Sequence, residues 1–171
     1  KESFGKGGSP EMAKEHFPST PATRFLKDKR IPFELHSYKY EEHGGTERAS
    51  NQLHVDENMI IKTIIMEDDR RRAFIVLMHG NKEISTKEMA RQLAVKSVGS
   101  CDPQRALKLT GYMVGGTSPF GTKQKLPVYI ESSILELPRI LINAGSRGLL
   151  AVISPLDLEK VLNPVKVKVA R

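Results

Sequence analysis

The chain has 171 residues, of which 39% are hydrophobic and 27% charged, a composition typical of one globular domain with a full core. It contains no apolar run long enough to span a bilayer, no apolar signal-peptide core at its start, and only one cysteine, which excludes an internal disulfide. These features predict a cytoplasmic protein without a membrane segment. The net charge of +7 favours a polyanionic partner, and the low aromatic content fits RNA backbone contact better than base stacking.

Residues 1–18 are rich in glycine and lysine and lack periodicity, so we interpret them as a flexible tail or an expression remnant. The folded domain is expected over residues 19–171. Its first helix should have Thr20 as N-cap and Pro21 in the first turn, and should end near Arg30.

The remaining elements follow from hydrophobic periodicity, turn residues and caps. In chain order, we expect a strand over 33–38, a helix over 46–53, a hairpin of strands over 59–66 and 73–79, helices over 86–93 and 103–109, strands over 112–114, 128–131, 140–144 and 149–153, a helix over 155–162 and a strand over 165–169. Strands scattered among short helices do not form the regular alternation of a doubly wound fold. The pattern predicts a single α+β domain on a mixed β-sheet or partly open barrel flanked by short helices.

One lysine interrupts an apolar strand. In M-I-I-K-T-I-I-M, residues 59–66, side chains alternate between two faces, and both faces are apolar apart from Lys62 and Thr63. A lysine there is costly unless it is paired or opens onto a polar cavity. Lys62 could simply extend to the rim of the sheet. We favour the hypothesis that it lines a cleft and binds an anion.

A glycine-rich loop, T-G-Y-M-V-G-G-T-S-P-F-G over residues 110–121, follows the next predicted helix. A glycine pair lets the backbone turn with positive φ and expose its N–H groups, and such amides can stabilise an oxyanion. The loop could equally be only a tight connection. A second turn, N-A-G-S-R-G over 143–148, follows an apolar strand and should end at the same cleft, where Arg147 is either a solvated turn charge or a phosphate ligand.

Other chemical motifs are not supported. The loop lacks the lysine-hydroxyl order of a phosphate-binding loop, and Phe120 occupies the second glycine position of a nucleophile elbow. Cys101 has no flanking pattern of a catalytic thiol. The histidines lack metal-ligand spacing, so we expect neither a metal nor a cofactor.

Four sequence blocks occur in order along the chain: T-P-A-T-R-F-L-K-D-K-R-I-P-F-E-L-H-S-Y, I-I-K-T-I-I, T-G-Y-M-V-G-G-T-S-P-F-G and G-S-R-G-L-L-A-V-I-S-P-L-D-L. Their order over residues 20–162 resembles the YbaK/EbsC family, which is related to the editing insertion domain of bacterial prolyl-tRNA synthetase. The resemblance implies a mixed α+β barrel-like sheet. It also implies a free-standing deacylase that hydrolyses mischarged aminoacyl-tRNA, notably Cys-tRNA(Pro), with prolyl-tRNA synthetase as a transient partner.

Carried over residue by residue, the resemblance places the family's essential lysine at Lys62 and its neighbouring threonine at Thr63. The functional glycine of the G-G loop falls on Gly115, and the tyrosine after the first strand falls on Tyr38.

Two positions depart from the family's pattern. Asn143 stands where members often have serine, and Leu150 where they often have aspartate. Because both positions line the family's pocket, the choice between cysteine and alanine as the removed amino acid stays open. The departures also leave a non-catalytic tRNA- or synthetase-binding module as the alternative, and a small-molecule hydrolase as a weaker one.

The resulting hypothesis is cleavage of the ester between the terminal ribose of tRNA and a wrong amino acid, with water or the substrate's own thiol as nucleophile. Lys62 would hold the terminal phosphate or ribose, while the amides of Gly115 and Gly116 polarise the ester carbonyl. Thr63 and Asn143 would set the pose of the amino acid. The other expected substrate-binding residues are Tyr38, Ser118, Gly145 and Arg147.

Overall fold

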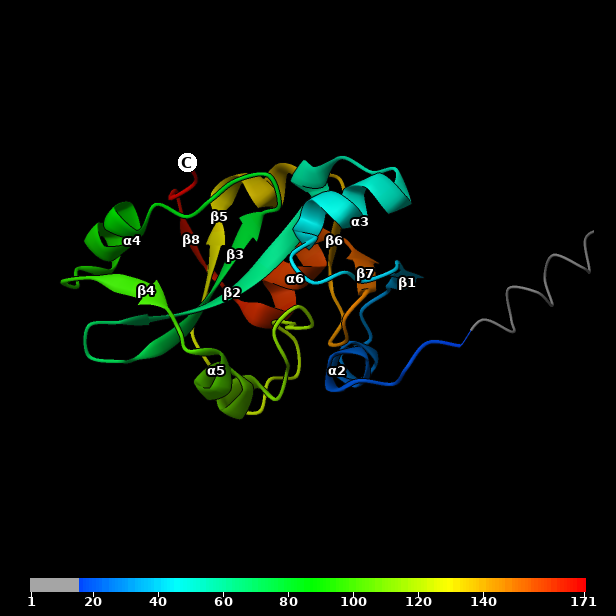
Figure 1. Ribbon diagram of the computed structural model, residues 1–171, viewed down its shortest axis with the longest axis horizontal. Coiled ribbons are helices and arrows are strands. Elements are labelled where there is room, and N and C mark those ends of the chain that lie inside the picture. The colour runs from blue at the N-terminus through cyan, green and yellow to red at the C-terminus, as the bar shows by residue number, and fades with distance from the viewer. Residues whose placement is uncertain (1–15) are drawn as a thin grey trace, which may run out of the picture.

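The computed structural model describes residues 16–171, where five α-helices and two short 3-10 helices surround one eight-stranded sheet (Figure 1). The helices are α2 (Pro21–Asp28), α3 (Gly45–Leu53), α4 (Thr86–Leu93), α5 (Pro103–Thr110) and α6 (Pro155–Leu162), with η1 (Glu57–Met59) and η2 (Ser132–Glu136). The strands are β1 (Glu34–Ser37), β2 (Ile60–Asp68), β3 (Ala73–His79), β4 (Val98–Ser100), β5 (Val128–Glu131), β6 (Ile140–Asn143), β7 (Leu149–Ile153) and β8 (Val165–Val167).

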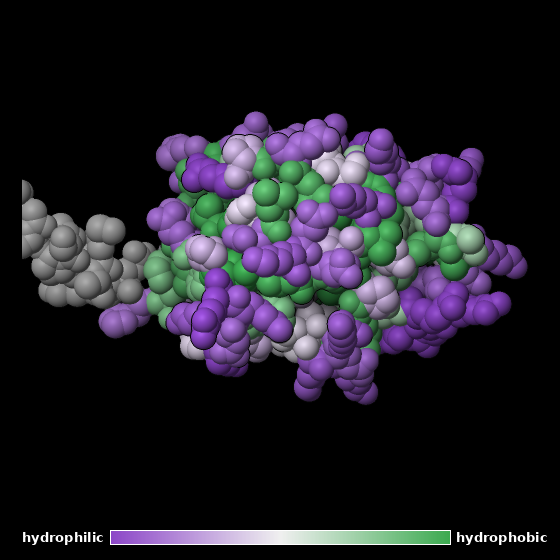
Figure 2. Space-filling model, turned by 180° about the vertical axis from the view of Figure 1, so that it is seen from behind, coloured by the Kyte–Doolittle hydropathy of each residue, from purple (hydrophilic) through white to green (hydrophobic). Residues whose placement is uncertain are grey.

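Residues 1–15, most of the expected tail, lie outside the described part of the chain. Within the expected tail, Phe17 packs against the main hydrophobic cluster, two residues before the predicted start of the domain. No helix among the described residues is both long and apolar enough to cross a membrane. The face turned away from the viewer of Figure 1 is covered mainly by hydrophilic side chains with smaller apolar areas between them (Figure 2).

The sheet is mixed and open, with the order β1-β7-β6-β2-β3-β5-β8. The predicted hairpin of β2 and β3 is antiparallel, whereas β6 joins β2, and β5 joins β3, in parallel. The prediction of an α+β domain on a mixed sheet is therefore confirmed.

The outer edge of β2 is shared by two short partners that leave a gap between them. β3 pairs with one edge of β2 from Ile61 to Glu67. On the other edge, β6 pairs only at Ile60 and Ile61, while β4 pairs from Met66 to Asp68. Residues 62–65 therefore have no strand beside them on this edge, and the sheet forks where the lysine lies.

The predicted strand over 112–114 is wrong. Helix α5 ends at Thr110, the next residue Gly111 caps it with a left-handed φ of 83°, and the chain then turns instead of extending. The buried hydroxyl of Tyr112 donates to the carbonyl oxygen of Phe120 at 2.5 Å, which ties the two ends of the glycine-rich loop together. The carbonyl oxygen of Met113 accepts a hydrogen bond from the amide of Gly116, which closes the next turn. The short strand β4 and both 3-10 helices were not predicted, because each is only three to five residues long.

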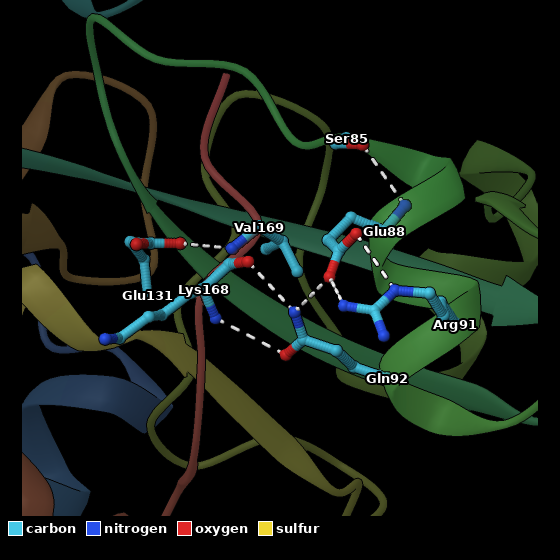
Figure 3. A network of polar contacts seen from close by, with 7 residues as sticks. All are labelled: Ser85, Glu88, Arg91, Gln92, Glu131, Lys168 and Val169. Carbon is cyan, nitrogen blue, oxygen red and sulfur yellow. Dashed lines mark hydrogen bonds and ion pairs between the residues drawn. The ribbon is translucent and has the colours of Figure 1, made fainter.

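The C-terminal segment is held on the sheet by a buried carboxylate. Glu131, at the end of β5, accepts hydrogen bonds from the amides of Val169 and Ala170 at 2.7 and 3.0 Å. Figure 3 shows this contact beside Gln92 of α4, whose side-chain amide donates to the carbonyl oxygen of Lys168. Two separate elements therefore fix the backbone that follows β8.

Replacing Glu131 by alanine should reduce the free energy of unfolding by about 2 kcal/mol, because the buried amide of Val169 and the partly buried amide of Ala170 lose their acceptor. The control Glu136→Ala removes an exposed carboxylate in η2 and should change stability by no more than about 0.5 kcal/mol. Urea unfolding of the two variants measures the difference. Equal stability of both variants would show that Glu131 does not anchor this segment.

Candidate functional site

A cavity of about 640 Å³ opens beside the gap in the edge of β2. Three parts of the chain enclose it besides β2 itself: the segment around α3, the start of α5 with the glycine-rich loop, and the turn after β6. Its lining residues include Tyr38, Tyr40, Thr46, Ala49, Lys62, Thr63, Ile65, Cys101, Ala106, Val114, Gly115, Asn143, Arg147 and Leu150. The fork in the sheet thus gives access from solvent to the middle of β2.

Lys62 lies on the β2 face between two small hydrophobic clusters. Its same-face neighbour Ile60 belongs to the cluster under α3, and Ile64 packs against the cluster under α4. The Lys62 ammonium group donates to the carbonyl oxygen of Lys82 at 2.5 Å. Burial lowers the pKa of Lys62, while the carboxylates of Glu83 and Glu57 raise it in part. The cavity wall therefore carries one half-buried amine with capacity for further hydrogen bonds.

Thr63 presents unused polar groups to the cavity. Its Oγ1 atom is buried and has no hydrogen-bond partner among the described residues. Backbone groups alternate in direction along a strand, and Ile65 accepts from the amide of Cys101 on the β4 side. The backbone N–H and C=O of Thr63 therefore point to the same side, into the gap where no strand pairs with β2. An unsatisfied buried hydroxyl is destabilising, which suggests that a ligand completes it.

The two consecutive glycines of the glycine-rich loop differ in whether their amides are already hydrogen-bonded. Gly115 has φ +87°, and a Cβ atom at this position would lie 2.5 Å from the hydroxyl of Tyr40. The Gly115 amide has no acceptor among the described residues, whereas the Gly116 amide donates to the Met113 carbonyl oxygen at 2.8 Å. Of the two consecutive glycines, only Gly115 therefore keeps its N–H available for an oxyanion.

The turn after β6 braces the glycine-rich loop. Arg147 donates from Nε to the carbonyl oxygen of Val114 at 2.8 Å, and its guanidinium group stacks on the ring of Tyr40 at 5.1 Å. Asn143 donates to the carbonyl oxygens of Gly115 and Ser146, and its Oδ1 accepts from the amide of Gly145. The C=O and N–H groups of one peptide point in opposite directions. By holding the Val114 carbonyl, Arg147 fixes the direction of the Gly115 amide.

The structure brings six of the nine predicted site residues to the cavity. They are Tyr38, Lys62, Thr63, Gly115, Asn143 and Arg147. Gly116, Ser118 and Gly145 lie outside its lining. Ser118 is fully buried and accepts from the amide of Phe120, and Gly145 packs against Tyr112 and Thr20. The side-chain amide of Asn143 makes hydrogen bonds to the turn and to Gly115, and its contact with the amino acid stays a prediction.

Sequence reasoning missed Tyr40, and it considered Cys101 only as a catalytic thiol, which no flanking pattern supports. Tyr40 lies in an irregular segment after β1, where no periodicity indicates its direction, and only the spacing from Tyr38 could have marked it. Cys101 lines the cavity, and burial and the carboxylate of Glu67 raise the pKa of its thiol, which disfavours the reactive thiolate. Arg105 opposes this effect without reversing it.

Residues 41–161 match the family of aminoacyl-tRNA editing domains. Because this span is well over half of the chain, the chain belongs to that family. The match confirms the family resemblance and supports deacylation of aminoacyl-tRNA as the general activity.

Individual relatives agree with this assignment. The chain is 26% identical over 145 residues to EbsC of Enterococcus faecalis, named as a candidate Cys-tRNA(Pro)/Cys-tRNA(Cys) deacylase, with 84% of this chain and 88% of EbsC covered. It is also 26% identical to a proline–tRNA ligase of Thermodesulfovibrio yellowstonii, covering 72% of this chain and 20% of the ligase. The crystal structure of a candidate trans-editing enzyme for prolyl-tRNA synthetase has a TM-score of 0.78 at 17% identity, covering 91% and 99% of the two chains, and shares the fold.

Thr63→Val should make the protein more stable and less active. The substitution keeps the shape and removes the unpartnered hydroxyl, so the free energy of unfolding should rise by about 1 kcal/mol while deacylation slows by about tenfold. Thr110→Val is the matched control, because the Thr110 hydroxyl is buried and donates to the Ala106 carbonyl oxygen. The control should lose stability. A Thr63→Val variant that is both less stable and fully active would contradict the assignment.

Arg147→Lys should lower kcat by about tenfold or more with little change in KM, because lysine keeps the charge but cannot reproduce the Nε hydrogen bond and the stacking. If Arg147 instead binds a substrate phosphate, lysine should preserve kcat and the variant should show a salt-dependent rise in KM. Steady-state deacylation kinetics at two salt concentrations separate the two roles.

Proposed function

We propose that this chain is a trans-editing deacylase that hydrolyses mischarged aminoacyl-tRNA, with Cys-tRNA(Pro) as its main substrate and Ala-tRNA(Pro) as the second. One observation carries the proposal: Lys62, the unpartnered Thr63 hydroxyl and the free Gly115 amide line the same cavity. A cation, a hydroxyl and an oxyanion donor are the groups needed to bind and polarise the terminal ester of an aminoacyl-tRNA.

In the proposed mechanism, the Lys62 ammonium group leaves the Lys82 carbonyl oxygen, or shares it, to bind a phosphate or ribose oxygen of the terminal nucleotide. The Gly115 amide donates to the ester carbonyl oxygen, whose negative charge grows in the transition state. Thr63 donates its hydroxyl to the amino acid or to the ribose. Positioning and oxyanion stabilisation then provide the rate enhancement.

The nucleophile is water or the thiol of a cysteinyl substrate. Cys101 lines the cavity, but its raised pKa keeps it protonated and makes it a poor candidate for covalent catalysis. In the thiol route, the substrate sulfur bonds to its own ester carbon, the ribose oxygen leaves with the thiol proton, and water later hydrolyses the released thioester.

An apolar wall supports a small apolar side chain as the removed group. Leu150 is buried in the cluster that contains Ala49 and Ile60, and both Leu150 and Ala49 line the cavity. A cysteine thiol behaves as a small hydrophobe, and a methyl group is apolar, so either fits this wall better than a hydroxyl. The name of EbsC supports cysteine over alanine.

Prolyl-tRNA synthetase is the proposed transient partner, because the chain is similar to part of several proline–tRNA ligases and to the solved structure of a candidate trans-editing enzyme for that synthetase. The reaction would take place in the cytoplasm, where tRNA is charged. A non-catalytic tRNA-binding module remains the rival function, since Asn143 and Leu150 replace residues typical of the family.

The deciding experiment measures release of cysteine and alanine from preformed Cys-tRNA(Pro) and Ala-tRNA(Pro), after subtraction of spontaneous hydrolysis. Wild type should hydrolyse the cysteinyl ester faster, and Lys62→Ala should lower the rate by about 10²–10³ because a charged anchor is lost. Lys82→Ala is the matched control, because it keeps the backbone carbonyl oxygen that Lys62 contacts. Near-wild-type turnover by a folded Lys62→Ala variant would contradict the proposed mechanism. No turnover by wild type would favour the non-catalytic tRNA-binding module.

A further inference from the structure

The segment that forms one wall of the cavity carries no acidic residue. From Pro103 to Ile130 the sequence contains no Asp or Glu, but it contains Arg105, Lys108, Lys123 and Lys125. This segment comprises α5, the glycine-rich loop and the return to β5. Its charge is therefore uniformly positive beside the cavity, although acidic residues are common elsewhere in the chain.

Three of these cations are exposed and free. Lys108, Lys123 and Lys125 form no ion pair within residues 16–171, whereas Arg105 pairs with Glu67. The amide of Lys123 donates to the Thr110 carbonyl oxygen at 3.0 Å, so the return segment runs along the last turn of α5. This contact brings Lys123 and Lys125 to the end of the helix that carries Lys108.

Exposed apolar side chains occur in the same segment. Leu107 is 43% exposed, and Met113 and Val114 are each 56% exposed, so three of the five large exposed apolar residues in the described chain lie here. Val114 also lines the cavity, which places apolar surface at the cavity mouth. Isolated exposed apolar residues are common, but three beside three free lysines form a mixed apolar and cationic surface. We call Leu107, Lys108, Met113, Val114, Lys123 and Lys125 the α5 surface.

We propose that the α5 surface binds the single-stranded 3′ end of the substrate RNA and guides it into the cavity. The proposal rests on the proposed function, which places the terminal ester in the cavity. Lysines bind phosphates as mobile point charges, and exposed apolar side chains contact the faces of unpaired bases, which a duplex does not offer. The cavity lies at one end of this surface, so the last nucleotide would enter beside Val114 and Gly115.

The test compares two variants of equal net charge. The first is Lys108→Gln/Lys123→Gln/Lys125→Gln. The control is Lys87→Gln/Lys160→Gln/Lys168→Gln, which changes three exposed lysines that do not line the cavity. The affinity of each for uncharged tRNA is measured across a range of salt concentrations.

The α5 variant should bind at least tenfold more weakly at about 0.1 M salt, and the slope of log K against log salt should become shallower by about 2, because three single-strand phosphate contacts contribute about 0.7 each. The control should keep the wild-type slope. Equal losses in both variants, or none in the α5 variant, would overturn the proposal.

A second pair of measurements tests the apolar part and separates this proposal from the proposed function. Leu107→Ser/Met113→Ser should weaken binding of intact tRNA but not of tRNA lacking its last three nucleotides, and equal effects on both RNAs would contradict base contact. The lysine variant should hydrolyse aminoacylated adenosine at the wild-type rate. Wild type could bind tRNA through these lysines but hydrolyse neither Cys-tRNA(Pro) nor Ala-tRNA(Pro). That result would contradict the proposed deacylase function and support RNA binding by the α5 surface.

Discussion

The incomplete pairing of one strand edge is the constraint on which the rest of the site depends. β2 pairs with β3 over most of its length, but its outer edge is divided between β6 and β4. A continuous strand in the gap would cover Lys62 and Thr63 and satisfy the backbone of Thr63. Because the edge forks, polar groups in the middle of an apolar strand reach a cavity. The sheet provides rigid support, and the gap provides access.

The glycine-rich loop becomes a defined structure only through contacts with distant residues. Arg147 and Asn143 hold two consecutive carbonyl groups of this loop, and Tyr40 packs against Gly115 too closely for any side chain there. The hydroxyl of Tyr112 closes the base of the loop on Phe120. These contacts preorganise the Gly115 amide, so that little reorganisation is needed when charge develops on a bound ester.

Lys62 and Thr63 in the middle of β2 lower the stability of the fold. A half-buried lysine and an unpartnered hydroxyl are both unfavourable in a sheet that is otherwise apolar, and neither improves packing. Elsewhere within residues 16–171 the buried side-chain polar atoms have hydrogen-bond partners, as Glu131 has with two amides. Such local exceptions concentrate where a ligand supplies the missing partner.

The sequence alone determined most of the secondary structure, since the caps at Thr20 and Ser85, the apolar periodicity and the hairpin all depend on neighbours in the chain. It also indicated Lys62, because a lysine in an apolar strand is anomalous wherever that strand lies. The tertiary structure decided which groups remain free. Residues 112–114 read as a strand but form a turn. The side chain of Asn143, the Nε of Arg147 and the amide of Gly116 already make hydrogen bonds within the two turns, which no local pattern indicates. Tyr40 reaches the site only because the chain after β1 runs beside the glycine-rich loop, which lies far along the sequence. Such long-range contacts cannot be predicted from a local sequence pattern, because that pattern depends only on neighbours in the chain.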